Sequence, residues 1–427
     1  MSTIHFVTLF STLEILRLSN GIPVLVQKDA SSEYLVVQAV VRTSNLPPSE
    51  IVGMEILAEA MIQETQNITP QRLSALTYLL GGNAHVFYKD GAIVFEIVTI
   101  PSYYSTAIGV LSEVLLYQDF SEENLRVASE KVQRRHRILN SDPIRSLLSR
   151  FRMALNIEFS PPSSLNEAYA KSLYFKNFHP GQIAFSIVGN ISSEAIAKRL
   201  NQSFGYWKSS VSFNSSISSS GTPPRMNKRQ TSTRPQEGDD TTQFHLSAVA
   251  VSGPPVSSAE FPAWLVVMNA IGGGKSSRMQ SNIRYKMAWA YASGVTFSFR
   301  HDKSWAIFYC LFRKTSDSLE KARKRTEELE KLITSSKNGF TEEETERAVR
   351  YTAGCYIAGE SNPYDSSSFG SGHHSASEKA FWVAWWELEG AGARMDTLFL
   401  EKIDSLTKED LNKSIRKWVN NPSTFTY

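Results

Sequence analysis

Glu59 is the first residue whose type and surroundings could do chemistry. It lies in an apolar helical pattern over residues 53–61, with Ile56 three positions before it and Ala60 directly after it. In a zinc-binding H-x-x-E-H helix both of those positions are histidines, so two imidazoles leave one helix face and meet one metal, while the glutamate acts as a base. Isoleucine and alanine have no ligand atoms. Ile56, Glu59 and Ala60 therefore form a degenerate zinc site, which is not expected to hold a metal.

Other polar segments give weaker signals for a site. His373 and His374 are adjacent in a stretch rich in Ser and Gly, and neighbouring side chains diverge, so such a pair rarely shares one metal. The run Gly274-Lys275-Ser276 resembles part of a phosphate-binding loop. It lacks the full glycine spacing of such a loop, however, and it follows a helical pattern where a strand would be needed. We expect no metal and no nucleotide in this chain.

Composition argues against several classes of partner. The chain has 45 Lys and Arg against 42 Asp and Glu, and this small net charge gives no reason to expect nucleic acid or an anionic membrane. Cys310 and Cys355 are the only cysteines, which is too few for a disulfide framework or a Cys-based metal site. The sequence shows no signal peptide and no apolar run of about 18 residues, so we expect no membrane span. A soluble, cytoplasmic chain is favoured, although the compartment stays open.

The chain contains an internal repeat. A short apolar strand pattern, a Pro-Pro pair and an apolar helix pattern follow one another at 39–63 and again from 248. The run Phe120-Ser121-Glu122-Glu123 likewise returns as Phe340-Thr341-Glu342-Glu343. Both quartets are typical helix starts, with a hydroxyl N-cap and acids in the first turn, and Thr341 with Glu344 predicts a capping box.

The repeat predicts two halves of the same architecture. In the first half we expect a hairpin at 16–26, strands at 34–42, 84–88, 92–99 and 183–188, and helices at 51–63, 104–116 and 122–139. Mixed strands and helices of this kind predict an α+β fold, with helices on one face of a mixed or antiparallel sheet. We expect halves at 1–208 and 241–427, joined by a linker at 209–240. A long surface loop within one domain is the alternative for that segment.

These features resemble the pitrilysin/insulinase family of zinc peptidases, the inverzincins. The resemblance extends over nearly the whole chain and is greatest to the short-chain members, which include mitochondrial processing peptidases and bacterial two-gene pairs. The second-half run, with its three glycines, is the most specific part of it. The segments that carry the resemblance are 18–24, 53–65, 81–84, 204–207, 272–279, 283–284 and 290–292.

The resemblance implies that the two halves face each other across a chamber, and that two chains close this chamber together. The catalytic chain of such a pair carries H-x-x-E-H and a later Glu as zinc ligands. Here the corresponding window, 134–138, holds no acid, and its His136 is expected to be solvated or in a salt bridge. The chain thus resembles a non-catalytic subunit, with no cofactor of its own and with zinc expected in a homologous partner that carries H-x-x-E-H.

The resemblance also indicates which residues would contact a peptide substrate. Arg284 and Tyr291 fall on a functional Arg/Tyr pair, whose side chains can donate hydrogen bonds to a scissile carbonyl and its oxyanion. The alternatives are a surface salt-bridge Arg and a half-buried Tyr. The resemblance implies two substrate-binding segments. One is the start of a strand that pairs with peptide, for which an ordinary turn and strand is the alternative. The other is a loop at the chamber mouth. The substrate-binding positions are Asn83, Ala84, Gly272, Gly273 and Gly274.

We therefore expect the chain to be inactive alone and to act as the non-catalytic subunit of a heterodimeric zinc metallopeptidase. A structural core or scaffold subunit of a larger complex, with no proteolytic role, is the alternative from another class. An independent peptidase with relocated ligands is a third.

Overall fold

The computed structural model describes residues 12–82, 84–158, 165–208, 244–313, 318–359 and 372–426. The chain forms two compact units, and each takes segments from both halves of the sequence. The first unit comprises Met1–Ile138, Glu158–Asn214 and His373–Leu398, and the second comprises Leu139–Ile157, Ser215–Gly372 and Phe399–Tyr427. Both are α+β, as predicted. The expected linker, 209–240, lies outside the described residues.

The first unit contains a six-stranded mixed sheet in the order β1-β2-β6-β3-β5-β4, in which only the β2–β6 pair is parallel. The hairpin predicted at 16–26 is present, and the strands predicted at 84–88 and 92–99 form a second one. Gly21 takes φ 88° after β1, and Asp90 and Gly91 both take positive φ between β4 and β5, which a type I′ turn requires. The strands are β1 (Leu13–Arg17), β2 (Pro23–Lys28), β3 (Leu35–Arg42), β4 (Ala84–Lys89), β5 (Ala92–Thr99) and β6 (Ile183–Gly189).

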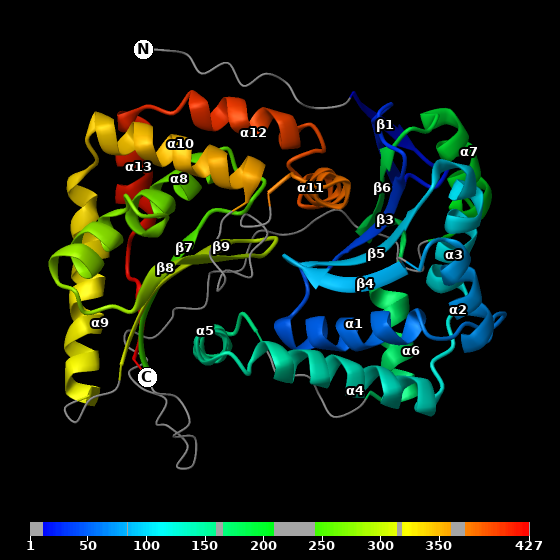
Figure 1. The fold of residues 1–427 in the computed structure, drawn as a ribbon, viewed down its shortest axis with the longest axis horizontal. Coiled ribbons are helices and arrows are strands. Elements are labelled where there is room, and N and C mark those ends of the chain that lie inside the picture. The colour runs from blue at the N-terminus through cyan, green and yellow to red at the C-terminus, as the bar shows by residue number, and fades with distance from the viewer. Residues whose placement is uncertain are drawn as a thin grey trace. The chain divides into compact units, whose positions relative to one another are not determined.

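Helices cover both faces of this sheet (Figure 1). One face packs on the apolar sides of α1, α3 and α7. On the other face lies α11 (Ala376–Leu388), a helix from the C-terminal half that packs on β3 and β6. The remaining bounds are α1 (Pro48–Met61), α2 (Pro70–Leu79), α3 (Tyr104–Leu116), α4 (Glu122–Leu139), α6 (Glu167–Asn177) and α7 (Ser193–Phe204), with 3₁₀ turns at Pro101–Tyr103 and Pro180–Gln182.

Segments that carried the sequence resemblance meet at one end of this unit. The Asn20 side chain donates hydrogen bonds to the carbonyls of Phe204 and Trp207, at 2.8 and 2.9 Å. Ser19 donates through its backbone to Asn201 and through its hydroxyl to the carbonyl of Gly205. The hairpin turn and the end of α7 are therefore locked together, which explains why both segments have distinctive sequences.

The second unit contains a four-stranded antiparallel sheet in the order β10-β7-β9-β8. Helices α8, α9 and α13 pack on the strands of this sheet. The strands are β7 (Phe244–Gly253), β8 (Ala292–Phe299), β9 (Ser304–Arg313) and β10 (Ser423–Thr426). The helices are α8 (Phe261–Gly272), a π-helix (Gln280–Lys286), α9 (Ser318–Ser335), a 3₁₀ turn (Ser336–Asn338), α10 (Glu342–Ala358), α12 (Met395–Asp404), which begins in the first unit, and α13 (Lys408–Trp418).

A helix from the N-terminal half, α5 (Pro143–Ala154), completes the core of the second unit. Its Phe151 stacks on Phe425 of β10, with ring centroids 5.1 Å apart, and its apolar side packs with β7 and β9. The two sequence halves thus exchange one helix each, α5 for α11. The predicted capping box at the start of α10 is present, with Thr341 and Glu344 bonded reciprocally.

Candidate functional site

The degenerate zinc site lies on α1, a helix that is buried on every side. Proline occupies the first turn of α1, and every residue from Ile51 to Met61 is buried. Such an all-round apolar helix belongs in a core. The side chains of Ile56 and Ala60 have no exposed surface, and both belong to the core of the first unit. The two positions predicted to correspond to zinc-binding imidazoles are therefore filled by apolar packing.

Glu59 is held by two cations from α4. Its Oε2 accepts a hydrogen bond from Arg135 Nη2 at 2.8 Å, and its Oε1 lies 3.4 Å from Lys131 Nζ. The Glu59 side chain is only 6% exposed, so its charge needs these partners.

A second ion pair joins the same two helices one turn away. His136 Nε2 lies 3.0 Å from Glu55 Oε2. The hydrogen bond to the Glu55 carboxylate raises the pKa of His136 above its usual value, against the opposing effect of burial. His136 was expected to be either solvated or in a salt bridge, and the structure shows the salt bridge.

These side chains do not fit a zinc ion. Ile56 and Ala60 offer no ligand atom, and both oxygens of Glu59 face cationic groups. The window 134–138, where the resemblance placed a third ligand, supplies the Arg135 guanidinium in place of a carboxylate. Throughout the described ranges, no cluster of three or more His, Cys, Asp or Glu side chains could bind a metal. His373 instead makes a buried bond to Asp396 at 2.7 Å.

A cavity of about 350 Å³ lies beside Glu59 in the first unit. Its walls come from the end of α1, from α2 and α3, and from the β4–β5 hairpin, and Lys131 of α4 also lines it. Lys131 therefore contacts both the cavity and the Glu59 carboxylate. No sequence pattern predicts this cavity, because its lining comes from five separate segments.

The strand expected to meet a peptide is at the edge of the first sheet. Ala84 opens β4, which is the outermost strand and pairs only with β5 in the described part of the chain. Half of its backbone groups therefore point away from the sheet. Asn83, the other predicted residue here, lies outside the described residues.

In the second unit, the predicted glycine run follows α8 and makes close contacts. Gly272 ends α8 against Phe308 and Val295, where a Cβ atom would clash with both. A Cβ on Gly273 would lie 2.6 Å from the Tyr351 ring, and Gly274, at φ 65°, faces the same ring still more closely. Close backbone approach thus gives a physical reason for glycine at these three positions.

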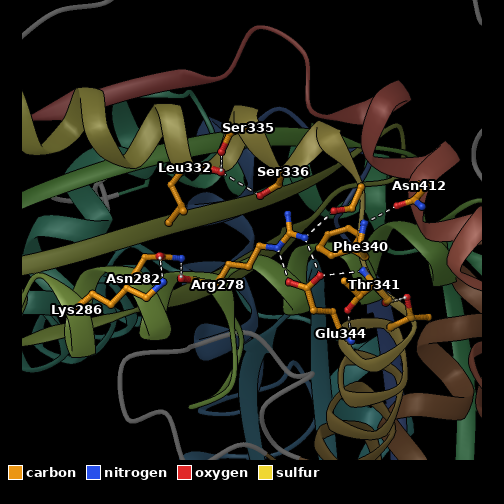
Figure 2. A network of polar contacts seen from close by, with 12 residues as sticks. Arg278, Asn282, Lys286, Leu332, Ser335, Ser336, Phe340, Thr341, Glu344 and Asn412 are labelled. Atoms are coloured by element: carbon orange, nitrogen blue, oxygen red, sulfur yellow. Dashed lines mark hydrogen bonds and ion pairs between the residues drawn. The ribbon is translucent and has the colours of Figure 1, made fainter.

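Arg278 anchors the segment that follows these glycines (Figure 2). Its guanidinium makes a bidentate pair with Glu344, with both distances 2.8 Å, and also donates to the carbonyl of Gly339 at 2.6 Å. The Phe340 ring lies 4.3 Å from the same group. The hydrogen bond from Arg278 lowers the pKa of Glu344. Arg278 therefore joins the start of the π-helix firmly to the start of α10.

Arg284 and Tyr291 both reach solvent from this anchored segment. Arg284 lies on the π-helix and is exposed, and within the described ranges it forms no ion pair. Tyr291 is 61% exposed, its backbone N–H donates to the carbonyl of Leu311 at 2.6 Å, and its ring packs 5.4 Å from Phe244. Neither alternative weighed from the sequence describes them, because Arg284 has no salt bridge and Tyr291 is more than half exposed. Both side chains are available to a ligand.

Comparison with known proteins supports the resemblance. Residues 164–351 match the family model described as the peptidase M16 inactive domain. The fold is similar to a protease from Helicobacter pylori, with a TM-score of 0.78 and 15% identity over 97% of this chain and 99% of that one. It is also similar to a peptidase M16 inactive domain from Pseudomonas fluorescens, with a TM-score of 0.73 and 13% identity over 97% of each chain. A search of curated protein sequences finds no match.

These matches confirm the resemblance to pitrilysin-type (M16) peptidases and, within them, to a non-catalytic member. No helix in the described ranges combines the length and apolar character needed to cross a bilayer.

Proposed function

Starting from this resemblance to non-catalytic M16 chains, we propose that the protein is the non-catalytic subunit of a heterodimeric zinc metallopeptidase. Its partner would be a homologous chain that carries H-x-x-E-H and the zinc ion. The substrate would be a peptide, enclosed in a chamber to which each chain contributes half. This chain would have no cofactor of its own.

The observation that carries the proposal is the ion pairing of Glu59. A chain that bound zinc at this place would need ligand atoms where Ile56 and Ala60 stand, and an acid in the window 134–138. Here a cation already neutralises the remaining carboxylate. This ion pairing supports a zinc ion held by another subunit of the complex.

The contribution of this chain to catalysis would come from Arg284 and Tyr291. A guanidinium and a phenol can donate hydrogen bonds to the substrate carbonyl and to the negative charge that develops on its oxygen. Both side chains are exposed, while Arg278 fixes the segment that carries Arg284. Arg284 is thus an accessible donor on a segment that is held in place, as preorganised stabilisation of a transition state requires.

Substrate binding is assigned to two segments. The edge strand that begins near Asn83 and Ala84 would pair with an extended peptide through its outward backbone groups. The segment Gly272-Gly273-Gly274, held close to Tyr351, would form part of the chamber mouth. Both assignments follow from the resemblance and from the position of each segment in its own unit.

The test is to assay a quenched fluorescent peptide with each purified chain and with an equimolar mixture. We expect cleavage only in the mixture. Arg284→Ala or Tyr291→Phe should lower kcat by about a hundredfold, since loss of one oxyanion donor typically costs 10²- to 10³-fold. Lys286→Ala and Tyr285→Phe are matched controls, because both residues are exposed on the same π-helix. The controls should retain activity.

Full activity in both Arg284→Ala and Tyr291→Phe would refute the role of that pair. Cleavage by this chain alone would refute the proposal itself. A stable complex with the homologous chain that cleaves nothing in any combination would favour the scaffold role, for which no feature of the described structure argues directly.

A further inference from the structure

The cavity beside Glu59 has the dimensions and lining of a ligand site. Its volume of about 350 Å³ falls within the range of small-molecule pockets. Its wall is divided about evenly between apolar and polar surface, with Leu73 of α2, Phe95 of β5 and Leu111 of α3 among the apolar lining residues. The apolar part of the wall suits an apolar side chain, and the polar part suits hydrogen-bonding groups. The degenerate zinc site does not use the cavity, and neither does the proposed catalytic pair.

Lys131 places a positive charge at the cavity, and its ammonium has more N–H donors than Glu59 can use. Its side chain is 46% exposed, and its ammonium lies 3.4 Å from Glu59 Oε1, longer than a good charge-assisted hydrogen bond. Arg135 makes the shorter contact to the same carboxylate. Two cations therefore share the Glu59 carboxylate. Glu96 also lines the cavity and accepts a hydrogen bond from Gln38 at 2.7 Å, so the positive charge is local to Lys131. An ammonium has three donors, and an incoming carboxylate could accept from it.

Polar groups on the lining fit amide groups better than an alkyl chain. The Thr77 hydroxyl donates to the carbonyl of Ser74, which leaves its oxygen able to accept. Gln63 donates to the backbone carbonyl of Glu59 and keeps an amide oxygen as acceptor. His85 lies on the edge strand, where backbone groups point away from the sheet. A purely hydrocarbon ligand would desolvate these groups without pairing them.

We propose that this cavity binds the C-terminal end of a peptide. The terminal apolar side chain fills the cavity between α2, α3 and the hairpin, and the terminal carboxylate pairs with Lys131. The inference rests on the proposed function and deepens it, because Ala84 of the proposed peptide-binding strand also lines the cavity. It concerns this chain alone and requires no partner or zinc.

The experiment measures binding of a short fluorescent peptide to the whole purified chain by polarisation. The peptide ends in leucine with a free carboxylate, and a second version carries a C-terminal amide. We expect the amide to bind at least about tenfold more weakly, as the loss of a hydrogen bond to a charged group implies. Binding of the acid should also weaken as salt is added.

Two variants and one control locate the site. Lys131→Gln should weaken binding of the acid peptide by about tenfold and leave binding of the amide peptide unchanged, because only the charged contact is lost. Ser74→Trp should abolish binding of both, since residue 74 is exposed and lines the cavity, so a large ring there would close it. Arg134→Gln removes one charge from the same helix at an exposed position outside the cavity and should change affinity less than twofold. Unchanged thermal unfolding of each variant verifies folding.

The proposal is overturned if acid and amide peptides bind equally, or if neither binds. Equal losses of affinity for the acid peptide in Lys131→Gln and Arg134→Gln would also overturn it. They would show that the loss depends on net charge and not on a contact with Lys131. Displacement of the peptide by decanoate at lower concentration than by the unlabelled peptide would identify a fatty-acid site instead. Failure here leaves the heterodimer assay untouched, and an inactive heterodimer leaves this binding result untouched.

Discussion

Glu59 depends on a guanidinium that lies 76 positions away in sequence. Removing that group leaves a buried carboxylate with only the more distant Lys131. We expect Arg135→Ala to lower the free energy of unfolding by about 1–3 kcal/mol, below the cost for a fully buried pair because Arg135 is 41% exposed. Urea denaturation measures the change.

The matched control for this change is Arg134→Ala, at the exposed neighbouring position on α4. It should alter stability by less than about 0.5 kcal/mol. Adding Glu59→Gln to Arg135→Ala removes the uncompensated charge and should recover part of the loss. Equal effects of Arg135→Ala and Arg134→Ala would contradict the importance given to the ion pair.

The His136–Glu55 pair should make stability depend on pH. The pKa of His136 is raised in the folded chain, chiefly by its hydrogen bond to Glu55. Protonated His136 therefore stabilises the fold. This contribution is complete below about pH 6.5, the unfolded value, and is lost as pH rises through the folded pKa. The stability gap between the wild type and His136→Asn should be largest near pH 5.5 and should shrink toward pH 8.5 in urea titrations. In the Glu55→Gln background the gap should no longer change in this way.

At the scale of elements, the glycines after α8 should tolerate no side chain. Gly274 combines φ 65° with a close contact to the Tyr351 ring, so Gly274→Ala should destabilise by about 1–3 kcal/mol. Gly354 is the control: it is exposed in the middle of α10, with open space where a Cβ would lie. Gly354→Ala should stabilise by about 0.5–1 kcal/mol. Thermal unfolding of both variants tests whether the two substitutions change stability in opposite directions.

Local patterns predicted the elements well, because each depends on neighbours in sequence. The strand expected at 92–99 and the helices expected at 104–116 and 122–139 have the observed bounds, and the Asp90-Gly91 turn has the positive φ values that its residues favour. That Ile56 and Ala60 mark a degenerate zinc site stays a prediction. The identity of the cation that binds Glu59, the cavity around Lys131 and the contact of Gly274 with Tyr351 could not be predicted, since each joins distant segments. Asn83 and the expected linker lie outside the described residues, and the roles of Arg284 and Tyr291 stay predictions.

At the scale of the whole molecule, the exchange of helices means that neither sequence half contains a complete core. In the first unit, α11 buries Trp382, Trp385 and Trp386. It also satisfies polar groups of the first sheet: Gln38 donates to the carbonyl of Ser377, and Arg42 donates to that of Leu388, both at 2.8 Å. The sequence predicted contiguous halves, and periodicity alone cannot reveal which sheet a helix joins.

A fragment of residues 12–208 should therefore fail to fold stably, because it lacks the helix that covers one sheet face. Joining residues 372–398 to it by a flexible linker should restore cooperative unfolding in urea. The same fusion with Trp382, Trp385 and Trp386 changed to Ala should not, since each buried Trp→Ala change costs about 3–5 kcal/mol and stabilities are typically only 5–15 kcal/mol. Cooperative unfolding of the unfused fragment, with stability equal to that of the fusion, would show that the first sheet does not need α11.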